Sequence, residues 1–96
     1  MNAIKSGRAE VAEAGEPMQL WPEAMEAHDV DIVALNTNMS RVWIGDNNVR
    51  AEVGNETGMP LEPGHVYHLD RVDMSTIYID SATAGEGVTW NVVNDV

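Results

Sequence analysis

The feature that most constrains the fold is a series of short apolar–polar alternations between residues 42 and 92, bounded by glycine, proline or asparagine. Successive side chains of a β-strand point to opposite faces, so a two-residue period predicts a strand with one buried face. Pro63-Gly64 fits the central pair of a type II turn, because glycine accepts the positive φ needed there. No long stretch has a helical period. The sequence therefore predicts an all-β fold, a small antiparallel β-sandwich or barrel of about seven or eight short strands.

Three alternations are the clearest, and each would place three apolar residues on one face. They are Val30, Ile32 and Ala34; Val49, Ala51 and Val53; and Val88, Trp90 and Val92. Residues 23–28 are locally helix-prone, but a helix of about six residues is marginal in isolation. We therefore expect a turn of helix or a loop there, with His28 in the loop.

The beginning of the chain allows three interpretations, namely a weak helix over residues 9–14, a strand, or a mobile arm. Because Gly7 and Gly15 bracket this stretch, we favour an edge strand preceded by loose residues. The predicted organisation is a flexible N-terminal arm over residues 1–8 and a single β-sandwich domain over residues 9–96. A chain of 96 residues is too short to build two separate cores.

The charge balance is strongly acidic, with 16 acidic residues against five basic ones and a formal net charge of -11. Self-repulsion at this density destabilises a compact state, and molar salt screens it by shortening the Debye length to about 3 Å. This favours a halophilic host; an ordinary acidic mesophilic protein is the alternative. The same charge disfavours binding to nucleic acid or to anionic membrane surfaces. The N-terminus also lacks the apolar segment of a signal peptide, so we expect synthesis in the cytoplasm.

The sequence offers little for catalysis or for cofactor binding. There is no cysteine, and no serine lies in a G-x-S-x-G elbow. No glycine-rich loop opens a helix that could hold a phosphate. The many acids leave paired-carboxylate chemistry open, but so small a chain has little room for a substrate cleft. We predict that the protein is not an enzyme and binds no cofactor and no small-molecule substrate.

The histidines and acids do not form a recognisable metal site. His65 and His68 are three apart on a predicted strand, so their side chains would point to opposite faces. Asp70 with Asp73, and the residues 46–48, resemble fragments of calcium loops but lack the alternating acidic frame with its terminal glutamate. We therefore predict no metal ligands.

Large aromatic side chains are the best candidates for contact with a partner. Trp90 shares a face with Val88 and Val92 and is expected in the core. Trp43 points away from Val42 and Ile44, so it either packs in a second layer or anchors an interface. The predicted interface residues are Trp43, Trp21, Tyr67 and Tyr78. A small domain without disulfides also often gains stability by oligomerising.

The order of these strand and turn signals resembles a group of small structural proteins of tailed bacteriophages and tailed archaeal viruses. The matching segments are 15–20 (GEPMQL), 42–49 (VWIGDNNV), 60–64 (PLEPG), 69–70 (LD), 75–80 (STIYID) and 87–90 (GVTW). The likeness covers residues 9–93. Members of this group look like compact β-domains repeated in the capsid shell, neck or tail. The usual pattern has fewer acids and more lysine, serine or threonine at exposed positions, and this chain departs from it.

The resemblance implies a virion structural protein, a capsid decoration or turret component that is assembled in the host cytoplasm. Its partners would be copies of itself or other virion proteins such as the major capsid protein. A tail or neck component is one alternative. The other is a carbohydrate- or receptor-binding module, in which Trp43, Tyr67 or Tyr78 would form a stacking platform.

Overall fold

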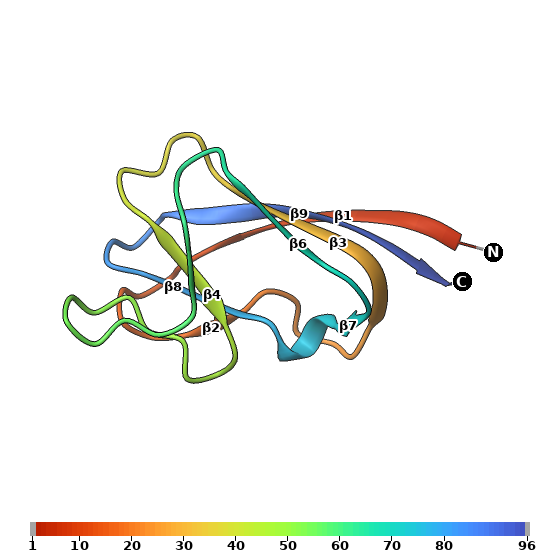
Figure 1. Cartoon of the computed structure of the whole chain (residues 1–96), viewed down its shortest axis with the longest axis horizontal. Coiled ribbons are helices and arrows are strands. Elements are labelled where there is room, and N and C mark those ends of the chain that lie inside the picture. The colour runs from red at the N-terminus through yellow and green to blue at the C-terminus, as the bar shows by residue number, and fades with distance from the viewer. Residues whose placement is uncertain (1, 96) are drawn as a thin grey trace.

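The computed structural model describes residues 2–95, with side chains described for residues 3–93. The elements are, in chain order, β1 (Asn2–Glu10), β2 (Met18–Gln19), β3 (Glu26–Ala34), β4 (Val42–Gly45), β5 (Met59–Leu61), β6 (Val66–Leu69), β7 (Val72–Asp73), a 3-10 helix (Met74–Thr76), β8 (Tyr78–Ser81) and β9 (Gly87–Asp95) (Figure 1). The predicted all-β antiparallel sandwich is confirmed, with nine strands in the described residues instead of seven or eight.

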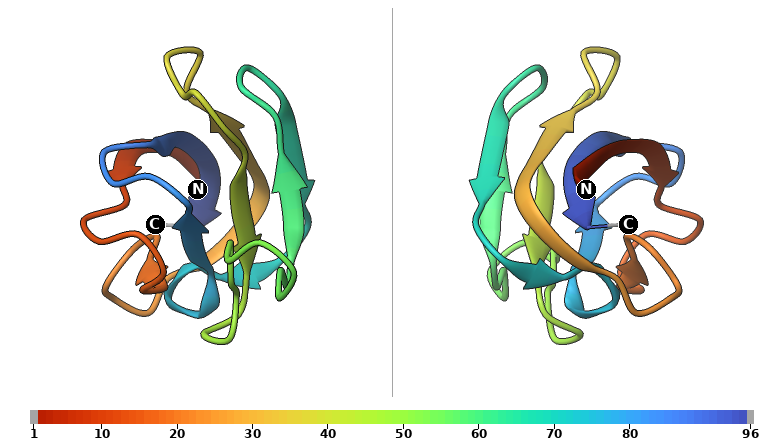
Figure 2. Two further views of the ribbon diagram at one scale, coloured as in Figure 1. Left: turned by 90° about the vertical axis from the view of Figure 1, so that its left-hand side faces the viewer. Right: turned by 90° about the vertical axis from the view of Figure 1, so that its right-hand side faces the viewer.

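The strands form two antiparallel sheets. The first sheet has the order β1-β9-β3-β6, with β7 also paired to β3, and the second has the order β2-β8-β4-β5. Viewed along the long axis of the molecule, the strands surround one interior (Figure 2). Both ends of the described chain lie at the same end of the molecule, because β1 and β9 run side by side (Figure 1).

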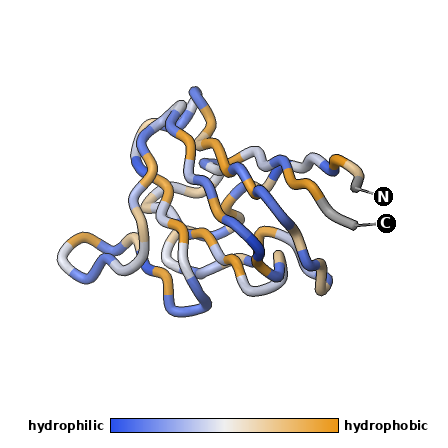
Figure 3. Tube along the Cα trace, turned by 45° about the vertical axis from the view of Figure 1, so that its right-hand side comes forward, coloured by the Kyte–Doolittle hydropathy of each residue, from blue (hydrophilic) through white to orange (hydrophobic). Residues whose placement is uncertain are grey.

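Both sheets contribute apolar residues to a single core. Hydrophobic and hydrophilic residues alternate along the strands (Figure 3), as the two-residue period predicts. The buried core residues include Val30, Ile32, Ala34, Val42, Ile44, Ile79, Val88, Trp90 and Val92. Two of the three predicted alternations are therefore confirmed as buried strand faces, those of β3 and β9.

The first strand begins at Asn2, whereas the sequence predicted a flexible arm over residues 1–8 and a strand from Ala9. β1 pairs with β9 along its whole length. Its inward positions carry Lys5, Gly7 and Ala9. These residues lack the apolar alternation that marks a buried face, which is why the pattern did not reveal the strand. Residue 1 of the predicted arm lies outside the described residues.

The segment 23–28 is not a turn of helix, because β3 already begins at Glu26. His28, which the sequence placed in a loop, lies in this strand. Ala27 is buried in the core and pairs with Val72 of β7. Pairing with β7 and β9 thus overrides the local helix preference of these residues.

The alternation of Val49, Ala51 and Val53 does not form a strand, and only one isolated bridge occurs in this segment. Val49 and Ala51 are buried, but Val53 is 86% exposed. Asp80 on β8 is fully buried, and its two carboxylate oxygens accept the N–H groups of Ala51 at 2.9 Å and Gly15 at 3.0 Å. This carboxylate ties two loops to the second sheet, so the segment is a loop held against the sheet from outside.

Candidate functional site: a histidine cluster and an open strand edge

The four aromatic residues that the sequence predicts at an interface lie on different faces. Trp21 and Tyr67 are half-buried and pack against the core. Trp43 and Tyr78 lie on the outer face of the second sheet, because the residues that alternate with them on β4 and β8 are buried inward. The structure brings Trp43 and Tyr78 onto one face and separates both from Tyr67, so the three cannot form a single stacking platform.

Trp43 lines an open depression between β4 and the loop that Asp80 holds. The depression has a volume of about 300 Å³. Its other lining residues are Ser40, Arg41, Ala51, Val53, Glu56, Glu62 and Ala82. The Arg41 guanidinium donates to the Glu62 carboxylate at 2.5 Å. An aromatic plane with polar groups around it is a surface that a sugar ring or a short peptide can contact.

Trp21 belongs to an aromatic pair that closes over the core. Its ring meets Trp90 edge to face, with ring centroids 5.5 Å apart and an interplanar angle of 72°. The Lys5 ammonium lies 4.5 Å from the centroid of the Trp21 ring, a cation–π contact. Trp90 is 3% exposed and confirms its predicted place in the core. The Trp21 ring therefore contacts both Trp90 and Lys5 within the same chain.

A β-bulge in β3 shapes the outer face of the first sheet. His28 pairs with Val93 and Asp31 pairs with Asn91, so β3 uses one residue more than β9 over this interval. Asp29 adopts a φ of 48°, in the left-handed region. Such a bulge turns the side chains that follow it to the opposite face from the one that simple alternation predicts. Its effect here is that His28 and Asp31, three apart in sequence, both lie on the outer face.

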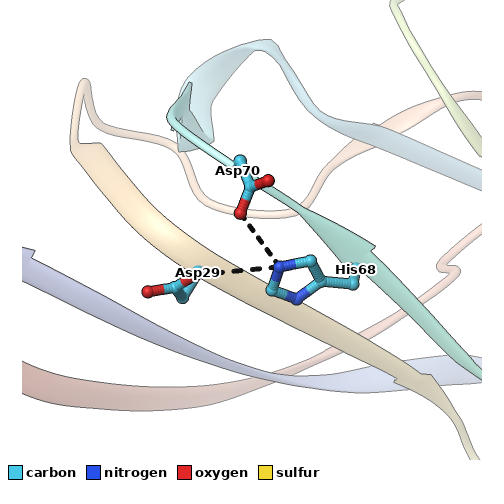
Figure 4. A group of neighbouring side chains, drawn as sticks. All are labelled: Asp29, His68 and Asp70. Atoms are coloured by element: carbon cyan, nitrogen blue, oxygen red, sulfur yellow. Dashed lines mark hydrogen bonds and ion pairs between the residues drawn. The ribbon is translucent and has the colours of Figure 1, made fainter.

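Three carboxylates surround His68, two from the bulged stretch of β3 and one just after β6; Figure 4 shows two of them, Asp29 and Asp70. His68 on β6 is directly opposite Asp31 on β3, and its Nδ1 lies 2.7 Å from Asp31 Oδ1. Its Nε2 lies 3.0 Å from Asp70 Oδ1 and 3.8 Å from Asp29 Oδ1. Both ring nitrogens therefore face acceptors, and the imidazolium, which donates from both, is the protonation state that suits this arrangement.

The His68 cluster, meaning His68 with Asp29, Asp31 and Asp70, carries excess negative charge. Hydrogen bonds to Asp31 and then to Asp70 raise the pKa of the His68 imidazole above its ordinary value. The His68 side chain is 47% exposed, so solvent screens the ion pairs and limits their strength. Without a protonated imidazole, three carboxylates would repel one another across the two strands.

One group of side chains in the described part of the chain could bind a single metal ion jointly. It consists of Asp29, His68 and Asp70. Their ligand atoms lie within 4.8 Å of one another. Imidazole and carboxylate are a donor set suited to zinc, and Asp31 at Nδ1 would orient the ring. A metal at Nε2 would have to displace the proton that this nitrogen shares with Asp70. All three groups are exposed, and exposed clusters of this kind commonly bind no metal.

Sequence reasoning missed this cluster because it tested His65 with His68 and Asp70 with Asp73, and did not combine a histidine with the aspartates. The signal is present as two short patterns, Asp29-Val30-Asp31 and His68-Leu69-Asp70, each with polar residues two apart. That spacing puts both polar residues of a strand on one face. What the sequence does not reveal is that β3 pairs with β6 in the register that sets Asp31 against His68.

The second surface feature is the free edge of β1. Val11 just beyond β1 donates its N–H to Glu86 O at 2.8 Å, which continues the β1–β9 ladder. Alternate residues of an antiparallel ladder bond to the same neighbour. The odd-numbered residues of β1 therefore bond toward β9. The N–H and C=O groups of Ile4, Ser6 and Arg8 point to the other side, where no further strand lies in the described part of the chain.

The other sheet edges offer less to a pairing strand. β2 has two residues, β6 has four, and β5 has three with Pro60 at its centre. Short strands and proline are the usual means by which edges avoid unwanted pairing. β1 has nine residues, no proline, and no acidic residue before Glu10. It is thus the longest edge, and its charged side chains before Glu10 are Lys5, which turns inward over Trp21, and Arg8, which pairs with Glu10.

Comparison with protein-family models, with curated proteins and with solved structures finds no match for this chain. In the described residues no helix has the length and apolarity that a membrane span requires.

Proposed function

We propose that this protein is a structural component of the virion of a tailed virus, a capsid decoration or turret unit that works by contact with other protein subunits. The observation that carries the proposal is the open edge of β1. A nine-residue strand edge without proline is a template for pairing with another chain. A protein whose role is contact has a use for such an edge, whereas other soluble domains protect theirs.

The distribution of charge supports the same proposal. Residues 2–9 contain Lys5 and Arg8 and no acid, although the chain has 16 acidic residues in all. The β1 edge is therefore where another acidic subunit meets the least repulsion. The remaining surface is acidic, which keeps an assembled particle soluble in concentrated salt. The resemblance to small virion β-domains, noted from the order of strand and turn segments, agrees with a contact role.

Mass spectrometry and electron microscopy of purified particles test the proposal. We expect the protein in particles at many copies each, with its density on the outside of the capsid. Absence from particles that retain the major capsid protein would reject a virion role. Density confined to the neck or tail would reject the decoration role and favour the alternative of a tail or neck component.

The depression beside Trp43 favours a second candidate, a carbohydrate- or receptor-binding module. A glycan array screened in high salt tests it, with Trp43→Ala as the disabling variant and Met39→Ala as a control for loss of an exposed side chain. Met39 is 91% exposed and lies outside the residues that line the depression. A hit lost in Trp43→Ala and kept in the control supports the module, and an array without hits counts against it.

A further inference from the structure

We propose that two copies of this chain form a two-fold symmetric dimer in which β1 pairs antiparallel with β1 of the second copy. The first sheets of both copies would join into one continuous sheet, in the order β6-β3-β9-β1 followed by the same strands in reverse. The inference rests on the proposed function, since both assign contact to the β1 edge, and it names the partner as a second copy.

The phase of the hydrogen bonds selects the residues that face each other. Ile4, Ser6 and Arg8 present their backbone N–H and C=O groups to the free edge, as the Val11–Glu86 bond establishes. In an antiparallel pair of this edge with itself, even-numbered residues must therefore lie opposite even-numbered residues. A register shifted by one would set outward-bonding residues against residues that bond to β9, and that pairing cannot form.

Full overlap of the two strands satisfies this condition. When all nine residues of β1 are paired, Ser6 lies opposite Ser6 of the second copy, on the symmetry axis. Ile4 then lies opposite Arg8 of the second copy. Both sets of outward-facing backbone groups are paired along the entire strand. A two-fold contact of this kind is closed, so the proposal predicts a dimer and not a fibre.

The side chains on the outer face are compatible with this register. Ile4 is 72% exposed, and the aliphatic stem of the opposite Arg8 would cover it. No two like charges lie directly opposite each other. In the fully overlapped register Lys5 lies diagonally next to Lys5 of the second copy. A shift by two residues in one direction instead sets Arg8 diagonally next to Arg8, and a shift in the other direction sets Lys5 directly opposite Lys5. Both shifts shorten the overlap, so the number of backbone hydrogen bonds selects the fully overlapped register.

Salt should strengthen this dimer. Each copy has a net charge of -11, so the two copies repel each other at low ionic strength. Screening removes that repulsion, and the backbone hydrogen bonds and the contacts of Ile4 are not ionic. An interface built from salt bridges would show the opposite dependence. The direction of the salt effect thus separates strand pairing from a charge-driven contact.

Sedimentation and light scattering of the purified protein, in low salt and in molar salt, give the first test. We expect a dimer whose dissociation constant falls as salt rises. Ser6→Pro should raise that constant at least about tenfold, because each copy loses an outward N–H and gains a ring at the axis. Proline fits there without breaking the β1–β9 ladder, whereas Lys5→Pro removes an N–H that bonds to β9 and should unfold the edge. Circular dichroism confirms that Ser6→Pro remains folded.

Oxidative cross-linking gives a second test that does not depend on proline. The chain has no cysteine, so Ser6→Cys introduces a single thiol at the proposed axis. Paired residues there lie about 5.5 Å apart at Cα, within the range that a disulfide spans. We expect Ser6→Cys to form a covalent dimer at least about tenfold faster than the exposed loop control Val53→Cys.

The outcomes decide the two proposals separately. A protein that stays monomeric in molar salt, with Ser6→Cys cross-linking no faster than Val53→Cys, overturns the dimer. A dimer that persists unchanged in folded Ser6→Pro overturns the β1 interface. The presence of the protein in virions is measured independently, so a monomer found in particles rejects only the dimer, and a dimer absent from particles rejects only the virion role.

Discussion

Replacing Gly7 with alanine should lower the free energy of unfolding by roughly 1–2 kcal/mol, because Gly7 lies against the indole of Trp90. A Cβ atom at this position would be 2.3 Å from Trp90 Cζ2 and 2.5 Å from Cε2. Carbon atoms normally approach to about 3.5 Å, so the indole would have to move by roughly 1 Å. Trp90 has little room to do so, since it is buried and packed against Trp21.

The magnitude follows from two opposing effects. Forcing an extra carbon into a packed core costs about 1–3 kcal/mol. Removing a glycine from the interior of a strand returns about 0.5–1 kcal/mol, because alanine loses less backbone freedom on folding. For a domain of this size, a net loss of roughly 1–2 kcal/mol lowers the melting temperature by roughly 5–15 °C. Urea unfolding followed by tryptophan fluorescence and by circular dichroism measures it.

A double-mutant cycle with Trp90→Phe tests the cause. Phenylalanine lacks the outer indole atoms that the new Cβ would meet, so Gly7→Ala should be at least about 1 kcal/mol less damaging in that background. Ser6→Ala, on the opposite face of the same strand, is the control; it removes one exposed hydrogen bond, from Ser6 Oγ to Asn91 Oδ1 at 2.6 Å, and its effect of about 0.5–1 kcal/mol should be the same in both backgrounds. Equal effects of Gly7→Ala in both backgrounds would refute the packing argument.

Three further changes probe the polar contacts. The pKa of His68 is raised chiefly by its hydrogen bond to Asp31. Its pairs therefore stabilise the fold below the unfolded pKa of about 6.5 and lose this effect as pH rises through the folded pKa. His68→Gln should thus lose stability at pH 5.5 and little at pH 9, and equal urea midpoint shifts at both would contradict this. The pKa of Asp73 is lowered, first by the backbone N–H of Ser75. Its contribution is present above about pH 3.9 and is lost as pH falls through the folded pKa, so Asp73→Asn should differ from the native protein at neutral pH and converge with it in acid. Asn38→Ala leaves the buried N–H of residue 87 without the side-chain oxygen that lies 3.1 Å away, which should cost about 1–3 kcal/mol in urea unfolding.

The parts of the fold that the sequence predicts well are the strands whose inner face is uniformly apolar. In β3 and β9 the inward residues are apolar, and the outward residues are mostly polar, so periodicity alone identifies the buried face. The Pro63-Gly64 turn also forms as expected, since Gly64 has a φ of 82° and His65 donates its N–H to Glu62 O at 3.0 Å. These features depend on neighbours in sequence.

The two-residue period fails as a strand signal where the alternating apolar residues belong to a loop that packs against a sheet. Val49 and Ala51 alternate as strand residues do, but a loop anchored by Asp80 buries them against the outer face of the second sheet. Nothing near residues 49–53 in sequence indicates the distant carboxylate that holds the loop. The His68 cluster is hidden for a related reason, because it needs the β3 bulge and the pairing of β3 with β6.

β1 links the difficulty of predicting this fold to the proposed dimer. Its inner face must stay small, because Trp90 occupies the space beside Gly7 and the Trp21 ring lies under Lys5. Of these inward positions only Ala9 contributes a buried apolar side chain, so β1 gains little from the hydrophobic effect and depends on its ladder with β9. A strand held mainly by backbone hydrogen bonds on one side is stabilised most effectively by a second ladder on the other. The small inner face that leaves β1 without an apolar pattern also leaves it little hydrophobic stabilisation. This is why its free edge gains stability from pairing with a second copy.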